Sequence, residues 1–483
     1  MNNETPTPHK VLVAIPSLAR GSKKWRDTGT ANDAYLGQLV NEYRSMSFQV
    51  DVVVFSDAPK EVAPGVELRV GLPTQDPGSL PFAHKQVFAD RLNDYDLFIY
   101  SEDDTLITAK TIRAFLRVSS ALPENEIPGF FRFERGPNGA LNYIDVHGHF
   151  HWDPQTIRTR GEFTLAFFTN HHSSCYAATR QQLKRAIDSG GFLVGPHEGR
   201  YDPVCTAATD LYTQCGFQEL VCISHLEDFH VEHLHNKYFG TRVDGADMRR
   251  QVDVLLRLAR NGERPASLFP TESKLTDTRY SKSYYEPVRP EIISAIPRGA
   301  RSVLSVGCGS GNTEAHLVER GLRVVAVPLD PAIATGAAAR GVEIVAADLS
   351  TAPQQLAEER FDCLLLINVL HLVPDPVNVL SSFGALLPAG SVAVFSVPNL
   401  SQLPAVWGKI RRDPRFQDLG NYDKTGVHFT SLGTIREWCR RAGMRFESAT
   451  PVLPVRARRL AGLALGLMDG FLASEFIAVA KRA

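Results

Sequence analysis

Four features common in other classes of protein are missing from this chain. None of its seven cysteines stands in a Cys-x-x-Cys pair, and their scattered positions predict reduced thiols rather than a zinc ribbon or a disulfide framework. The formal net charge is only −1, which argues against a nucleic-acid-binding protein. No apolar run reaches the roughly 20 residues that span a bilayer, and MNNETPTPHK does not read as a secretory signal. We therefore expect a soluble, cytoplasmic protein without a transmembrane segment.

The length and a polar internal stretch predict two domains. A chain of 483 residues exceeds what one core normally fills, since domains of about 100–250 residues are typical. The proline-containing stretch NGERPASLFPTESKLTDTRYSKS lacks periodicity and suits a linker. Before it, strand-like runs alternate with helix-like ones, which favours an α/β fold with a mostly parallel sheet. We predict α/β domains at residues 1–256 and 280–483, joined by a linker at residues 257–279.

The stretch VLSVGCGSGN, at residues 303–312, is an apolar strand that runs into a glycine-rich turn. Gly307, Gly309 and Gly311 allow a tight bend and the close approach of a ligand. A helix-compatible sequence follows directly. Similar turns occur in nicotinamide and flavin enzymes, so the turn alone does not identify the ligand.

The segments around this turn resemble, in order, the motifs of the class I S-adenosylmethionine (SAM)-dependent methyltransferases. The second strand leads into PLDP, which contains Asp330, and the third, GVEIVAAD, ends in Asp348. The fourth, within FDCLLLINVL, is followed by Asn368. The resemblance covers roughly residue 280 to the C-terminus and implies a Rossmann-like fold. It also implies SAM as the cofactor, held by the three glycines of the turn together with Asp330, Asp348 and Asn368.

Two positions depart from the pattern of this family. Ser305 stands where an acid is expected at the end of the first strand, and Pro328 stands where the ribose-binding acid is expected. Asp330, two residues farther on, is the predicted substitute, because a carboxylate that accepts both ribose hydroxyls forms strong, orienting hydrogen bonds. A domain kept only for packing is the alternative.

Two histidines are candidate bases for methyl transfer. His371 follows Asn368, and His428 opens the segment HFTSLGTIREWCRRAGM. Because imidazole is neutral near pH 7, either ring is able to take a hydroxyl proton, although packing or orienting roles are alternatives. The C-terminal stretch VRARRLAGLALGLMDGFLASEFIAVAKRA predicts either a peripheral membrane contact or the last helix and strand of the sheet.

In the N-terminal domain, three consecutive acids follow an apolar strand. Glu102, Asp103 and Asp104 thereby stand at the carboxyl end of the strand, the edge where open α/β sheets bind ligands. Clustered carboxylates repel one another unless a divalent cation neutralises them, and oxygen ligands suit Mg²⁺ or Mn²⁺. The sequence predicts a cation site here; a solvated acidic loop is the alternative.

The same region resembles the GT-A glycosyltransferases. These enzymes open on a strand like VLVAIPS, continue with one like VDVVVFSDA, and carry a DxD-type acidic motif after a buried strand. The resemblance implies a nucleotide-sugar donor, a glycan or other saccharide acceptor, and a metal ion that stabilises the departing diphosphate. It assigns Glu102 and Asp104 to the metal, with His233 and His235 as further ligands.

An inverting glycosyltransferase also needs a carboxylate base within reach of the attacking oxygen. Glu198 and Asp210 are the candidates, with Asp202 between them. A retaining enzyme needs no such base, so the stereochemistry stays open. Histidines at positions 147, 149 and 151 and at 171 and 172 raise a zinc hydrolase as a rival, but the HExxH signature is missing.

Together these patterns predict a bifunctional glycan-modifying enzyme of polysaccharide biosynthesis. Its N-terminal domain transfers a sugar from a nucleotide-sugar, and its C-terminal domain methylates a hydroxyl with SAM. Fusion raises the local concentration of one product at the next site. One alternative is a methyltransferase with a non-catalytic glycan-binding N-terminal domain. The other is a glycosyltransferase with an inert methyltransferase-like scaffold.

Overall fold

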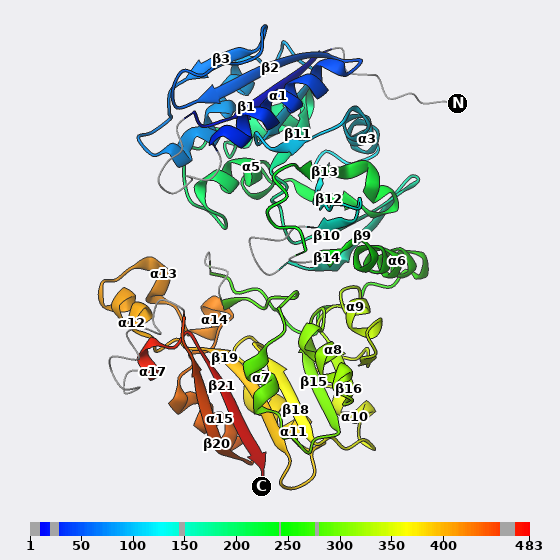
Figure 1. The fold of residues 1–483 in the computed structure, drawn as a ribbon, viewed down its shortest axis with the longest axis vertical. Coiled ribbons are helices and arrows are strands. Elements are labelled where there is room, and N and C mark those ends of the chain that lie inside the picture. The colour runs from blue at the N-terminus through cyan, green and yellow to red at the C-terminus, as the bar shows by residue number, and fades with distance from the viewer. Residues whose placement is uncertain (1–9, 20–28, 144–149, 241–242, 276–279, 455–468) are drawn as a thin grey trace. The chain divides into compact units, whose positions relative to one another are not determined.

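The computed structural model describes residues 10–19, 29–143, 150–240, 243–275, 280–454 and 469–483. The chain divides into two compact units (Figure 1). The first comprises Met1–His147 and Trp152–Arg264, and the second comprises Gly148–His151 and Pro265–Ala483.

The first unit is built around a five-stranded sheet whose middle strands are mostly apolar. The strand order is β11-β4-β1-β2-β3. The strands are β1 (Lys10–Pro16), β2 (Gln49–Ser56), β3 (Glu67–Val70), β4 (Leu97–Ser101) and β11 (Cys175–Thr179). Strand β11 runs antiparallel to β4, whereas the other pairs are parallel. Every residue of β4 is buried, as expected for a parallel strand covered on both faces.

Two smaller sheets complete the strands of this unit. One has the order β6-β12-β10-β9 and the other β14-β8-β7-β13-β5. Their strands are β5 (Thr105–Leu106), β6 (Glu126–Pro128), β7 (Phe131–Arg135), β8 (Leu141–Tyr143), β9 (Trp152–Arg160), β10 (Phe163–Phe168), β12 (Gln218–Cys222), β13 (His230–His233) and β14 (Val243–Asp244). The helices are α1 (Gly29–Ser45), η1 (Pro77–Ala83), α2 (His84–Asp90), α3 (Ala109–Ser119), α4 (Arg180–Asp188), α5 (Pro203–Thr213), η2 (Ile223–Phe229) and α6 (Gly245–Asn261).

The second unit is an α/β structure with one seven-stranded sheet, ordered β17-β16-β15-β18-β19-β21-β20. The strands are β15 (Ser302–Cys308), β16 (Arg323–Pro328), β17 (Glu343–Ile344), β18 (Cys363–Ile367), β19 (Val392–Pro398), β20 (Met444–Val452) and β21 (Glu475–Arg482). The first five are parallel, and β21 inserts antiparallel between β19 and β20. This is the Rossmann-like architecture predicted for the C-terminal domain.

Short helices connect these strands. They are α7 (Pro290–Ala295), α8 (Asn312–Glu319), α9 (Thr335–Ala338), α10 (Ala352–Gln355), α11 (Pro376–Gly384), α12 (Leu403–Ile410), α13 (Pro414–Gln417), α14 (Tyr422–Thr425), α15 (Leu432–Arg441) and α17 (Asp469–Leu472). No helix in the described ranges is long and apolar enough to cross a membrane. Residues 455–468, which hold the arginines of the predicted membrane contact, lie outside the described residues.

The segment expected to be a linker differs from the structure at its start. Helix α6 continues through residue 257 to Asn261 and ends on Gly262, whose φ of 71° provides a left-handed cap. From Pro265 onward the described residues belong to the second unit. The sequence places this boundary too early because the apolar positions of α6 extend to Leu258, which is buried.

Candidate functional site

The glycine loop follows β15, which lies between β16 and β18 at the point where the strand order of the sheet reverses. Ligands of open α/β sheets bind in the crevice at this point. Gly307 and Gly311 have left-handed φ values of 84° and 73°. A Cβ atom on Gly309 would lie 2.2 Å from the carbonyl oxygen of Tyr284. That oxygen accepts a 2.7 Å hydrogen bond from the Ser310 amide, so the loop packs directly on the preceding segment.

A buried ion pair stands beside this loop. Lys282 donates from Nζ to Glu286 Oε1 at 2.6 Å and to the Ile367 carbonyl at 2.7 Å. Both charged side chains line a small cavity together with residues 309–314 of the loop. Burial raises the pKa of Glu286, although Lys282 opposes the shift. The second oxygen of Glu286, Oε2, is buried and has no hydrogen-bond partner among the described residues.

The acid that the resemblance leads us to expect at position 305 is missing; this position lies in the middle of β15, and a carboxylate from the next helix contacts it. Ser305 donates from Oγ to Glu314 Oε1 at 2.7 Å, and both residues are buried. Glu314 lies in the first turn of α8, where a carboxylate is favoured by the helix dipole. It also lines the cavity beside the loop. The site therefore has a carboxylate although the strand position holds serine.

The two acids predicted to contact the nucleoside part of SAM are both held by local backbone. Asp330 is buried just after β16 and accepts from the amides of Ala332 and Ile333 at 2.7 and 3.1 Å. Asp348 accepts three hydrogen bonds at Oδ1, from the Ser350 amide and hydroxyl and the Thr351 amide. These bonds lower the pKa of Asp348 to about 2.

Asp348 also lines a cavity of about 240 Å³ with mainly apolar walls. The other lining residues are Pro265, Ala266, Leu268, Pro328, Leu329, Pro331, Ala346 and Ala347. Pro328 thus forms part of a wall where the family carries an acid. Such an apolar slot with one carboxylate at its edge suits a flat heterocycle.

Two site residues are predicted after β18. Asn368 has an unfavourable backbone conformation, and the His371 side chain is buried. Asn368 has a φ of 52°, a conformation that few non-glycine residues adopt and that clusters at ligand sites. The His371 ring donates from Nε2 to the Tyr280 carbonyl at 2.9 Å. Burial lowers the pKa of His371 to about 3. Because its Nδ1 is also buried, the ring is placed to position backbone rather than to take a proton.

His428 is less enclosed. Its backbone amide donates to the His371 carbonyl at 2.8 Å, and its ring donates from Nε2 to the Val373 carbonyl at 3.0 Å. The ring stacks on Tyr422 with centroids 4.2 Å apart. Burial lowers its pKa, so the imidazole is neutral near pH 7.

In the first unit, the three acids follow β4 as the sequence predicts, at the switch point beside β1. Asp103 accepts from the Ser17 hydroxyl at 2.7 Å. Asp104 lies 3.2 Å from Nε2 of His233, whose Nδ1 contacts Glu134 at 2.6 Å. Burial alone would lower the pKa of His233, but the hydrogen bonds to Asp104 and Glu134 raise it.

The predicted metal ligands therefore do not all meet at one point. With both ring nitrogens on carboxylates, His233 is favoured as the charged imidazolium, which has no lone pair for a metal. The His235 ring stacks near it, with centroids 6.3 Å apart. Glu102 instead meets His172, 3.3 Å away, and Cys205. The sequence gives no spacing that joins these three, because strand pairing brings the loop before β11 beside β4.

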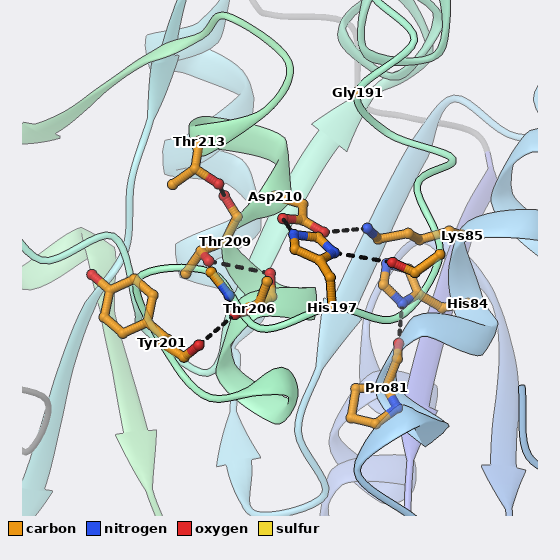
Figure 2. Close-up of polar contacts among 12 residues, drawn as sticks. Pro81, His84, Lys85, Gly191, His197, Tyr201, Thr206, Thr209, Asp210 and Thr213 are labelled. Carbon is orange, nitrogen blue, oxygen red and sulfur yellow. Dashed lines mark hydrogen bonds and ion pairs between the residues drawn. The ribbon is translucent and has the colours of Figure 1, made fainter. Parts of the chain in front are cut away.

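The two predicted acceptor bases lie in different surroundings. Glu198 is exposed on a loop. Asp210 is buried in α5 between the side chains of Lys85 and His197, as Figure 2 shows. It forms an ion pair with buried Lys85, and Nε2 of His197 lies 3.4 Å from its other oxygen. The ion pair of Asp210 with Lys85 joins α5 to α2.

Those histidines of the rival hydrolase hypothesis that the structure describes do not gather at one point. His171 pairs with Glu219 at 2.7 Å, whereas His172 pairs with Glu102. His151 stacks on Tyr284 with centroids 4.5 Å apart. Residues 147 and 149 lie outside the described residues.

Comparisons with known proteins bear on the C-terminal part of the chain. A family model described as a methyltransferase domain matches residues 249–449. The ubiquinone biosynthesis O-methyltransferase of Xanthomonas axonopodis pv. citri (strain 306) is 29% identical over 178 residues, which cover 35% of this chain and 72% of that protein. An uncharacterized methyltransferase of Mycobacterium bovis is 32% identical over 117 residues, covering 23% and 58%. A solved SAM-dependent methyltransferase from Mesorhizobium loti is 21% identical, with a TM-score of 0.30 and coverage of 40% and 96%.

These matches support the prediction of a methyltransferase domain in the C-terminal part of the chain. They do not show the GT-A fold, the divalent cation or a second activity. The alternative of a methyltransferase with an additional N-terminal domain fits them better than the bifunctional enzyme.

Proposed function

We propose that the second unit, a class I SAM-dependent methyltransferase domain, transfers the methyl group of SAM to a hydroxyl oxygen of a small molecule. The observation that carries this proposal is the ion pair of Lys282 and Glu286 against the glycine loop. The methionine end of SAM carries an ammonium and a carboxylate. A buried carboxylate oxygen and an ammonium with a third N–H group match these charges.

The remaining cofactor contacts follow from the two cavities. The slot edged by Asp348 suits adenine, and both chain neighbours of Asp330, Leu329 and Pro331, line this slot. Glu314 supplies the carboxylate that Ser305 lacks. When bound, SAM supplies an electrophilic methyl group on a sulfonium. The residues of this chain bind it, orient it and exclude water.

Oxygen is the proposed acceptor atom because curated relatives are named as O-methyltransferases. His428 is the proposed base, since its neutral ring is only partly buried whereas His371 is sealed. A proton taken from the acceptor hydroxyl makes the oxygen a stronger nucleophile.

A second candidate function, sugar transfer from a nucleotide-sugar by the first unit, is favoured by one arrangement. The acids Glu102, Asp103 and Asp104 stand at the carboxyl end of β4, beside the switch point of a largely parallel sheet. In this proposal a divalent cation at the acids binds a donor diphosphate, and the methyltransferase unit modifies the product glycan.

Binding of S-adenosylhomocysteine tests the first proposal, and binding of nucleotides with Mn²⁺ tests the second. Isothermal calorimetry with the full chain measures both separately. Saturable binding of S-adenosylhomocysteine is expected. If the full chain shows no such binding, methyl transfer by this unit is refuted.

A further inference from the structure

Three ligand-type side chains from distant segments converge in the first unit. Glu102 follows β4, His172 precedes β11, and Cys205 lies in the first turn of α5. One donor atom from each residue lies within 4.8 Å of the other two. This spacing allows a single ion to contact all three after small side-chain adjustments.

The chemistry of the three side chains suits a bound cation. His172 and Cys205 are buried, and Glu102 is partly buried. Imidazole and thiol groups are ligands of transition metal ions, and a coordinated thiol loses its proton to the ion. The Glu102 carboxylate adds an oxygen ligand whose charge offsets part of the charge of the ion.

We propose that Glu102, His172 and Cys205 bind a divalent transition metal ion of the Zn²⁺ class. Thiolate and imidazole ligands select such ions, whereas Mg²⁺ and Mn²⁺ prefer oxygen. Three protein ligands leave the fourth position of a tetrahedral ion open for another molecule. This ligand set differs from the predicted one, which joined Glu102 to Asp104, His233 and His235, and the two assignments are alternatives for the Glu102 carboxylate. The site is independent of methyl transfer by the second unit.

A buried arginine indicates what occupies the open position. Arg132 on β7 is 6% exposed and donates from Nη1 to Ser174 Oγ. Its Nε and Nη2 have no hydrogen-bond partner within the described ranges. Ser174 also accepts, through its carbonyl, a 2.9 Å bond from the Glu102 amide, which ties the arginine to the cluster. Unpaired buried N–H groups of a charged side chain are costly.

The charges of the cluster lead to the same ligand class. A divalent ion, the thiolate, the Glu102 carboxylate and the Arg132 guanidinium leave one positive charge. An anionic oxygen, such as that of a phosphate, neutralises this charge and pairs the free guanidinium N–H groups. The cluster is therefore a metal site for an anionic ligand.

Cobalt substitution tests the metal site in the 483-residue chain. Co²⁺ bound through a thiolate gives a sulfur-to-metal charge-transfer band in the near ultraviolet and d–d bands in the visible. We expect both bands at one Co²⁺ per chain, with displacement by Zn²⁺. Cys205→Ser removes the charge-transfer band, and His172→Asn weakens Co²⁺ binding by more than about tenfold. Cys222→Ser, which alters a buried thiol outside the cluster, leaves both unchanged.

Two outcomes overturn the assignment. The first is the absence of the charge-transfer band from the wild-type spectrum. The second is the persistence of this band in the spectrum of Cys205→Ser. Thermal unfolding and S-adenosylhomocysteine binding of the same samples separate a lost site from a lost fold. For the anionic ligand, pyrophosphate is the probe. It should shift the d–d bands of the wild type but not those of Arg132→Met, and an equal shift in both refutes the role of Arg132.

Discussion

Replacing Glu286 by glutamine removes the charge proposed to bind the ammonium of SAM while keeping the shape of the side chain. A hydrogen bond to a charged group contributes about 1.5–3 kcal/mol. Since about 1.4 kcal/mol corresponds to a tenfold change in affinity, Glu286→Gln should weaken S-adenosylhomocysteine binding about 10- to 100-fold. The change also leaves Lys282 without its carboxylate partner, although the Ile367 carbonyl still accepts from Nζ.

Calorimetry measures this loss directly. Glu291→Gln is the matched control, because Glu291 is an exposed glutamate in α7 of the same unit. The Glu291→Gln protein should bind S-adenosylhomocysteine with the affinity of the wild type. Thermal unfolding of both variants shows whether the fold is kept. Unchanged affinity in a folded Glu286→Gln protein would refute the proposed role of the ion pair.

The pH dependence gives a second readout of the same residue. Burial raises the pKa of Glu286 above its unfolded value, so the folded chain holds this proton to higher pH. The stability contributed by the protonated carboxyl is therefore present at low pH and is lost as pH rises through the folded pKa. Ligand affinity should rise over the same interval, because the ammonium favours the ionised carboxylate. Glu286→Gln should remove both dependences.

Three further predictions concern the rest of the chain. Asp210→Asn leaves Lys85 buried without a counter-charge and should lower the free energy of unfolding of the first unit by about 3–5 kcal/mol in urea titrations; an unchanged midpoint would contradict the structural role of the pair. Gly309→Ala places a Cβ against the Tyr284 carbonyl and should abolish S-adenosylhomocysteine binding in calorimetry, and retained affinity would show that the loop does not need this close packing. His428→Gln should lower kcat for methyl transfer by about 100-fold or more with unchanged cofactor affinity, and an unaltered kcat would exclude it as the base.

The sequence predicts the fold of the second unit well because each motif that indicates it lies within a short continuous segment of the chain. The glycine turn, the apolar run of β18 and the acid at Asp348 each lie within one strand–loop segment. The antiparallel strand β21 also lies where the final apolar run predicts it.

Side-chain contacts between residues on separate elements could not be predicted from the sequence in the same way. From the sequence alone, Ser305 indicates that the expected acid is absent. In the structure, Glu314 of α8 accepts a hydrogen bond from the Ser305 hydroxyl and brings a carboxylate to this position. The pair of Lys282 and Glu286 has helical spacing, but only the fold places it against the glycine loop.

In the first unit, the acids are predicted correctly at the end of β4, whereas their partners His172 and Cys205 depend on the pairing of β11 with β4. The predicted ligand His233 is instead committed to two carboxylates. The sequence shows that these histidines are present but not which acid each one meets.

Whether the second unit binds the SAM cofactor is decided by calorimetric titration of the 483-residue chain with S-adenosylhomocysteine. We expect saturable binding at one site per chain, weakened by Glu286→Gln but not by Glu291→Gln. Absence of binding to the folded protein would contradict the assignment of the second unit as a working methyltransferase.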